Sequence, residues 1–122
     1  MSYLLKKKSI AVDFDGVLSN YASGWQGIDN IPDNPVPGAI EWLNSMVERY
    51  EVHIYSCRSE STEGRGAMYA WLYRHGALVD HLNFPETKPN AHLYIDDRAY
   101  TFTGTNFPDN SYIDSFKPWN KK

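Results

Sequence analysis

Residues 8–17 read KSIAVDFDGV, a short apolar run followed at once by two carboxylates. The run at 9–12 predicts a short buried strand. Asp13 and Asp15 follow it, with Phe14 between them predicted to point into the core. A buried charge is costly unless a partner compensates it. The rest of the sequence should therefore contain partners for these two acids.

The remainder of the chain alternates predicted strands with predicted helices. Further strands are expected at residues 51–56, 78–84 and 91–97, with an edge strand at 111–114. Helices are expected at 37–49 and 67–75, and polar loops at 19–37 and 57–66. Alternation of this kind indicates parallel βαβ units. The sequence thus predicts an α/β, three-layer, Rossmann-like domain over residues 1–122, with a mostly parallel sheet.

Composition narrows the class of protein. The chain of 122 residues is 42% hydrophobic and 22% charged, which is typical of one globular domain. Its net charge of -3 supplies no basic field for nucleic acid or anionic membrane. No apolar stretch approaches the roughly 20 residues of a membrane span. The single cysteine, Cys57, excludes an intrachain disulfide and fits a cytoplasmic location.

Acidic and phosphate-binding side chains are predicted to converge at one edge of the sheet. In an open parallel sheet, ligands bind outside the carboxyl ends of the strands. The side chains expected there are Asp13, Asp15, Ser56, Asp96 and Asp97, with Lys88 in the loop before the last strand. Four carboxylates repel one another unless a cation neutralises them, and Mg²⁺ prefers such oxygen ligands. Mg²⁺ sites often bind phosphate as well, which an ammonium and a hydroxyl would help to hold.

The first two acids suit a phosphoryl transfer. Asp13, held ionised, could attack phosphorus and form an aspartyl-phosphate. Asp15 lies two residues on, so its side chain points the same way along an extended chain. It could protonate the leaving oxygen and later deprotonate water. Gly16 allows a tight turn and a close approach of the backbone to a ligand.

The segments DFDGV, YSCRS, TKP and YIDDR, in this order, resemble the four signature motifs of the haloacid dehalogenase (HAD) phosphohydrolase superfamily. The resemblance implies a Mg²⁺-dependent phosphomonoester hydrolase with Asp13 as nucleophile and Asp15 as general acid/base. It implies a metal held by the Asp13 side chain, the Asp15 backbone carbonyl and the last acidic pair, with Asp97 favoured as the direct ligand. Ser56 and Lys88 would hold the phosphoryl group.

Two details refine this resemblance. The DDR form of the last motif is similar to the phosphatase domain of phage polynucleotide kinase, which points to nucleotides or nucleic-acid 3′-phosphate ends as substrates. The family often has another acid shortly after the last pair, and DDRAYTFTG supplies none. The gaps between motifs hold no full cap domain, so the 19–37 loop is the only predicted lid. A neighbouring subunit in a homo-oligomer is another way to cover an open site.

Several alternatives remain open from the residues. Ser56 could cap its own loop, and Lys88 could be a solvated surface residue. Arg58 and Arg98 could clamp a phosphate or form ion pairs with the acids. Trp25 could stack on a base or pack within the 19–37 flap. For the whole chain, the alternatives are a non-catalytic regulatory or nucleic-acid-binding module and a phosphotransferase that uses an acceptor other than water.

Overall fold

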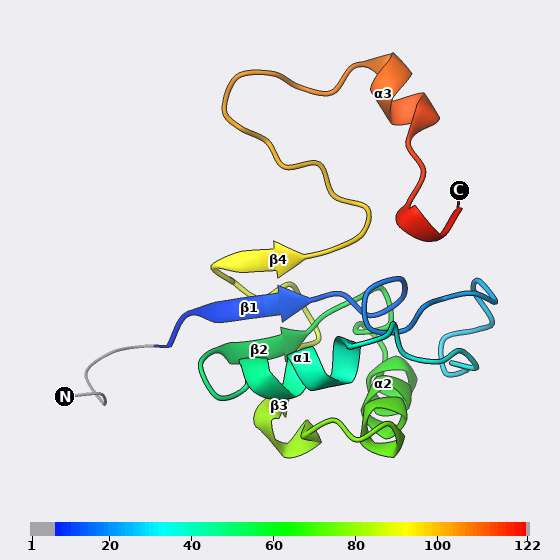
Figure 1. Ribbon diagram of the computed structural model, residues 1–122, viewed down its shortest axis with the longest axis vertical. Helices are drawn as coiled ribbons and strands as arrows, with labels where there is room; N and C mark the ends of the chain where they lie inside the picture. Colours follow the sequence, from blue (N-terminus) through cyan, green and yellow to red (C-terminus); the bar gives the residue numbers. More distant parts are fainter. Residues whose placement is uncertain (1–6, 122) are drawn as a thin grey trace.

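The computed structural model describes residues 7–121 and is built on a four-stranded parallel sheet (Figure 1). The strands are β1 (Ser9–Val12), β2 (Glu51–Ile54), β3 (Leu82–Asn83) and β4 (Leu93–Ile95), in the order β3-β2-β1-β4. All three neighbouring pairs are parallel. The predicted α/β class and the Rossmann-like parallel sheet are confirmed, and residues 7–121 contain no cap domain.

Strand β1 lies between β2 and β4, and the three strands end level with one another. Val12 pairs with Ile54 on one side and with Ile95 on the other. One residue further on, the Asp13 N–H donates to the Ile95 carbonyl at 2.9 Å, and the Tyr55 N–H donates to the Val12 carbonyl at 3.0 Å. The register therefore brings the residues that follow these strands to one edge of the sheet.

The helices differ from the prediction at their boundaries. The structure has α1 (Ala39–Met46), α2 (Thr62–Arg74) and α3 (Asn110–Ser115), with short 3₁₀ turns η2 (Val79–His81) and η3 (Trp119–Lys121). The start predicted for α2, at residue 67, was wrong because Ser61 caps a helix that begins at Thr62. The Ser61 side chain accepts from the Gly64 N–H at 2.9 Å, the hydrogen bond expected of an N-cap. Glycines in the first turn had obscured this start.

The predicted edge strand at 111–114 was also wrong, because these residues lie in α3. The Asp109 side chain caps this helix by accepting from the Tyr112 N–H at 2.8 Å. None of the helices in the described part of the chain is long and apolar enough to cross a membrane.

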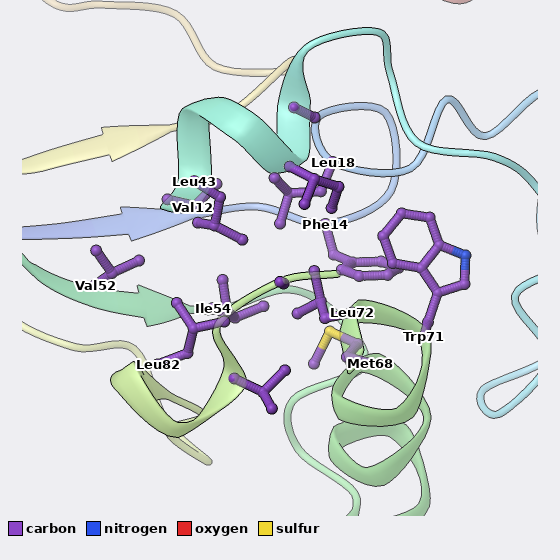
Figure 2. Packing of buried hydrophobic residues seen from close by; sticks show 14 of the residues in the cluster. Val12, Phe14, Leu18, Leu43, Val52, Ile54, Met68, Trp71, Leu72 and Leu82 are labelled. Carbon is purple, nitrogen blue, oxygen red and sulfur yellow. The ribbon is translucent and has the colours of Figure 1, made fainter. Parts of the chain in front are cut away.

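The hydrophobic core lies between one face of the sheet and the helices α1 and α2 (Figure 2). Val12 and Ile54 point into it from the strands, Leu43 from α1 and Trp71 from α2. Phe14 is fully buried and packs edge-on against Trp71 with ring centroids 5.0 Å apart, which confirms its predicted direction. Because both helices contribute to this one core, they cover the same face of the sheet.

The opposite face of the sheet has a different environment. Side chains alternate along a strand, so Ala11, His53 and Tyr94 point away from the core, in register with one another. Among residues 7–121, α3 is the only further α-helix, and it has no buried residue. In Figure 1 it lies far from the sheet, at the outer end of the loop that follows β4. The described chain thus provides the sheet and one helical layer, and α3 does not form a third.

Candidate metal and phosphate site

A tight turn after β1 places the first acidic residues at the edge of the sheet. The Gly16 N–H donates to the Ser19 carbonyl at 2.8 Å, and the Leu18 N–H donates to the Phe14 carbonyl at 2.9 Å. Gly16 has a φ of 85°, and a Cβ at this position would collide with the Asp97 carboxylate. Glycine is therefore required at this position for two reasons, the positive φ angle and the close approach of the Asp97 carboxylate.

Three carboxylates meet beside this turn. Asp13 follows β1, and Asp96 and Asp97 follow β4. Each offers an oxygen, and the three oxygens all lie within 4.8 Å of one another. Two of these side chains have backbone donors: Asp13 Oδ1 accepts from the Phe14 N–H at 2.8 Å, and Asp96 Oδ1 accepts from the Arg98 N–H at 2.7 Å. We call Asp13, Asp96 and Asp97 the acidic triad.

The acidic triad fits a hard divalent cation. Asp97 Oδ1 is buried and has no hydrogen-bond partner in the described residues. A buried carboxylate oxygen without a partner is costly, and a bound cation would remove that cost. Because all three side chains offer oxygen, the donor set suits Mg²⁺ better than metals that prefer thiolate or imidazole. The side chains that could hold it are those of the triad.

The pKa values in the acidic triad also show the cost of burying carboxylates side by side. Burial raises the pKa of Asp13 from 3.8 to about 7, although the hydrogen bond from the Phe14 N–H lowers it; the negative charges of Asp96, Asp97 and Asp15 raise it further. Burial also raises the pKa of Asp97. Without a cation, the three carboxylates are thus held together against their mutual repulsion.

Asp15 does not join the triad, because its carboxylate turns toward Arg58. Arg58 Nε and Nη2 donate to the two Asp15 oxygens at 2.9 and 3.1 Å, and the arginine is 1% exposed. Its Nη1 donates to the carbonyls of Gly27 and Ile28, and its Cζ lies 4.5 Å from the centre of the Trp25 ring. Of the two alternatives for Arg58, the structure favours the ion pair over the phosphate clamp. Only the backbone of Asp15 stays available as the metal ligand that the resemblance implies.

The 19–37 loop is a flap held in place by hydrogen bonds at its base and to α2. Its base is closed by a bridge between Ser19 and Pro35 and by a hydrogen bond from the Asn20 N–H to the Asn34 carbonyl at 2.9 Å. The Trp71 Nε1–H of α2 donates to the Asp33 carbonyl at 2.9 Å. Together with the contacts of Arg58, these bonds fix the flap on the Asp15 side of the site.

Ser56 and Lys88, the two residues expected to hold phosphate, have side chains that point to different places. The Ser56 hydroxyl accepts from the Arg58 N–H at 3.1 Å and lies 3.3 Å from Met68 Sδ, so it stabilises its own turn. Lys88 Nζ lies 4.7 Å from the centre of the Tyr94 ring. Lys88 also lines a hollow of about 540 Å³ together with Asp13, Asp96 and Tyr94. Lys88 thus lines the same hollow as Asp13 and Asp96, with its ammonium against the Tyr94 ring, whereas the Ser56 hydroxyl faces α2.

Sequence reasoning missed one contact at this site. Trp119 Nε1 donates to the Gly16 carbonyl at 2.7 Å, and Asn120 Nδ2 donates to the Asn20 carbonyl at 3.2 Å. The partners are more than 99 residues apart in the chain. Only the presence of a tryptophan in a polar terminal segment could have drawn attention to it.

Comparisons with protein-family models, curated proteins and solved structures each found no match to this chain. The class of this protein is therefore defined by the geometry of its fold and site alone. This is a small α/β protein with a Rossmann-like parallel sheet and, at the carboxyl ends of β1 and β4, three aspartates that could hold a metal ion.

Proposed function

We propose that this protein is a Mg²⁺-dependent phosphomonoester hydrolase of the haloacid dehalogenase type. The observation that carries the proposal is the acidic triad, gathered from two strand ends around the buried, unpartnered Asp97 Oδ1. The order and content of the four sequence motifs support the same assignment. Two further observations support the proposal: Asp13 and Lys88 line one hollow, and Asp97 offers an oxygen to the acidic triad.

The proposed reaction uses Asp13 and Asp15 in succession. Bound Mg²⁺ would neutralise the acids and the phosphoryl oxygens. The Asp13 carboxylate attacks phosphorus and the bond to the leaving oxygen breaks. Asp15 supplies the proton that this oxygen takes up; for this step Asp15 first takes a proton from water and its ion pair with Arg58 opens. Asp15 then removes a proton from a water that attacks the phosphorus, releasing phosphate and restoring Asp13. Arg58 is a positioning residue, because it holds the Asp15 carboxylate in place.

The substrate phosphate would lie in the hollow beside the triad. Lys88 lines that hollow and offers a positive charge. The Ser56 hydroxyl faces a thioether, which is a weak acceptor, so its proton can turn to a phosphate oxygen at little cost. The hollow is open, and no cap domain limits the bulk of the substrate. We therefore propose nucleotides and nucleic-acid 3′-phosphate ends as the first substrates to test, with the protein in the cytoplasm, where its exposed thiol Cys57 stays reduced.

The test is Mg²⁺-dependent hydrolysis of an aryl phosphate by an Asp13→Asn variant. We expect turnover to fall by roughly a thousandfold or more, because the nucleophile is lost. Asp114→Asn, which removes an exposed acid from α3, is the matched control and should keep full activity. Undiminished turnover in Asp13→Asn, with its fold intact by circular dichroism, would exclude the mechanism.

The substrate panel separates the remaining alternatives. It should contain nucleotides, sugar phosphates and 3′-phosphorylated oligonucleotides, each with and without Mg²⁺. Failure to hydrolyse any of them, together with specific binding of a partner, would favour a non-catalytic module. Product that forms only when an acceptor other than water is added would favour a phosphotransferase.

A further inference from the structure

The C-terminal part of the chain presents an apolar surface that nothing in the described structure covers. We call residues 98–118 the aromatic arm. Every residue from Arg98 to Lys117 is exposed except Pro108, which is half-buried. The large apolar side chains exposed on the arm are Tyr100, Phe102, Phe107, Tyr112, Ile113 and Phe116. A patch of this kind marks an interaction surface.

The arm is an ordered structure. The rings of Phe102 and Phe107 stack with centroids 4.5 Å apart, and Tyr100 meets Tyr112 edge-on at 5.4 Å. One end of the arm continues from β4, and the other is tied to the turn after β1 by Trp119. Between these ends it extends away from the sheet (Figure 1). Its apolar surface is thus presented outward from the chain that carries it.

The charges of the arm favour a protein as its partner over a nucleic acid. Asp109 and Asp114 balance Arg98 and Lys117, so the arm has no net positive charge. Nucleic-acid surfaces need clustered Lys and Arg to neutralise phosphates. An uncharged aromatic surface instead resembles the core of a protein–protein interface.

The face of the sheet opposite α1 and α2 has no helix of the described residues on it, and Tyr94 is exposed there although Ala11 is buried. Ala11, His53 and Tyr94 point to this face, and the hollow beside the acidic triad opens on it. Only α1 and α2, among the α-helices of the described residues, pack on the sheet, and they lie on the other face. One molecule thus contains both a sheet face without a helical layer and an aromatic arm without a surface to pack on.

The exposed area of the chain is large enough to supply an interface. The chain exposes 8236 Å². A compact monomer of 14.0 kDa exposes roughly 6,700 Å². The excess is roughly 1,500 Å², and each partner in a standard interface buries only about 800 Å². Half of the excess would therefore supply one partner's share of a stable dimer.

We propose that the aromatic arm packs on the open sheet face of a second copy of this chain, so that two copies exchange arms in a symmetric dimer. Reciprocal exchange of this kind uses the same two surfaces in both copies and closes on itself. Residues 99–101 of the arm line the hollow that contains Asp13 and Lys88 within their own chain, and the outer part of the arm would border the same hollow in the other copy. The dimer itself does not depend on the proposed phosphatase activity. Only the statement that the arm borders a substrate does.

The first experiment measures the mass in solution by light scattering and sedimentation over a series of concentrations. We expect a mass of twice 14.0 kDa for the full chain. The double variant Phe107→Ser/Ile113→Ser should raise the dissociation constant of the dimer at least a hundredfold. Tyr73→Ser removes an equally exposed aromatic residue from α2 and should leave the dimer unchanged. Circular dichroism should show that the variants are folded.

The second experiment locates the arm. In a Cys57→Ser background, one chain carries Phe107→Cys on the arm and a differently tagged chain carries His92→Cys at the rim of the open face. A short bismaleimide should link the two tags. A monomer at every concentration, a dimer that survives the double variant, or links between Phe107→Cys chains alone would each overturn the proposal. A dimer that hydrolyses no phosphate would keep the exchange and reject the phosphatase.

Discussion

Arg58 and Asp15 form a two-point ion pair, with Nε 2.9 Å from Oδ2 and Nη2 3.1 Å from Oδ1. The same guanidinium donates from Nη1 to the carbonyls of Gly27 and Ile28 in the flap, and it lies against the Trp25 ring. One buried side chain therefore links the proposed general acid/base to the loop that flanks it. A change at Arg58 should affect both.

Replacing Arg58 by alanine should destabilise the fold by about 3 kcal/mol or more, because it leaves the Asp15 carboxylate without its partner. Urea unfolding measures this. Arg74→Ala, at an exposed position of α2, should change the stability by less than about 0.5 kcal/mol. Amide hydrogen exchange at residues 24–30 should also become faster in Arg58→Ala. Flap exchange rates that match the wild type would show that Arg58 does not hold the flap.

The raised pKa of Asp13 predicts an unusual dependence of stability on pH. Between about pH 4 and pH 7, the folded metal-free protein holds a proton that the unfolded chain has already lost. The free energy of unfolding should therefore fall as the pH rises through this window. In EDTA, the wild type should lose about 2 kcal/mol relative to Asp13→Asn between pH 5 and pH 8. Parallel pH profiles for the two proteins would refute a buried, repelled carboxylate at this position.

The Asp97→Asn change should weaken Mg²⁺ binding, yet it should stabilise the metal-free protein. Removing one negative charge lowers the repulsion in the acidic triad, so the metal-free variant should be more stable than the wild type. It also removes a ligand, so the dissociation constant for Mg²⁺ should rise by about tenfold or more. Titration calorimetry and thermal unfolding in Mg²⁺ measure both. Asp114→Asn is the control, and equal Mg²⁺ affinity in the two variants would contradict the site.

Gly16→Ala and Gly24→Ala separate backbone strain from crowding. Both glycines have a positive φ, 85° and 70°, so either alanine strains the backbone by about 1 kcal/mol. A Cβ at Gly24 meets nothing within 4 Å, whereas one at Gly16 collides with the Asp97 carboxylate. Gly16→Ala should therefore lower the free energy of unfolding more than Gly24→Ala does. It should also weaken Mg²⁺ binding. Similar losses in both variants would place Asp97 elsewhere.

The sequence predicted the parts of this structure that depend on local pattern. The apolar run before Asp13 and the alternation of strands and helices were sufficient for the parallel sheet, because strands of this kind must be buried and joined by crossovers. The rule that ligands bind at the carboxyl ends of parallel strands then predicted that the acids after these strands would converge, and Asp13, Asp96 and Asp97 do meet there. The predictions failed at two helices whose starts are set by capping residues, Ser61 for α2 and Asp109 for α3.

The directions of several polar side chains at the site were decided only by the tertiary structure. From the sequence, Arg58 was equally suited to a phosphate or to an acid, and only the packed flap directs it to Asp15. Ser56 turned to its own loop because Arg58 offers an N–H nearby. Trp119 reaches Gly16 across the whole chain, a contact that no local pattern encodes.

Residue type and spacing thus determined which chemical groups this protein brings to the carboxyl edge of its sheet, because strand register follows from the periodicity of apolar side chains. Which of those groups face a ligand, which pair with one another and which surfaces stay open was decided only when distant segments packed. The free energy of a side chain depends on the partners within a few ångströms of it, and for Arg58, Asp97 and the aromatic arm those partners come from other parts of the fold.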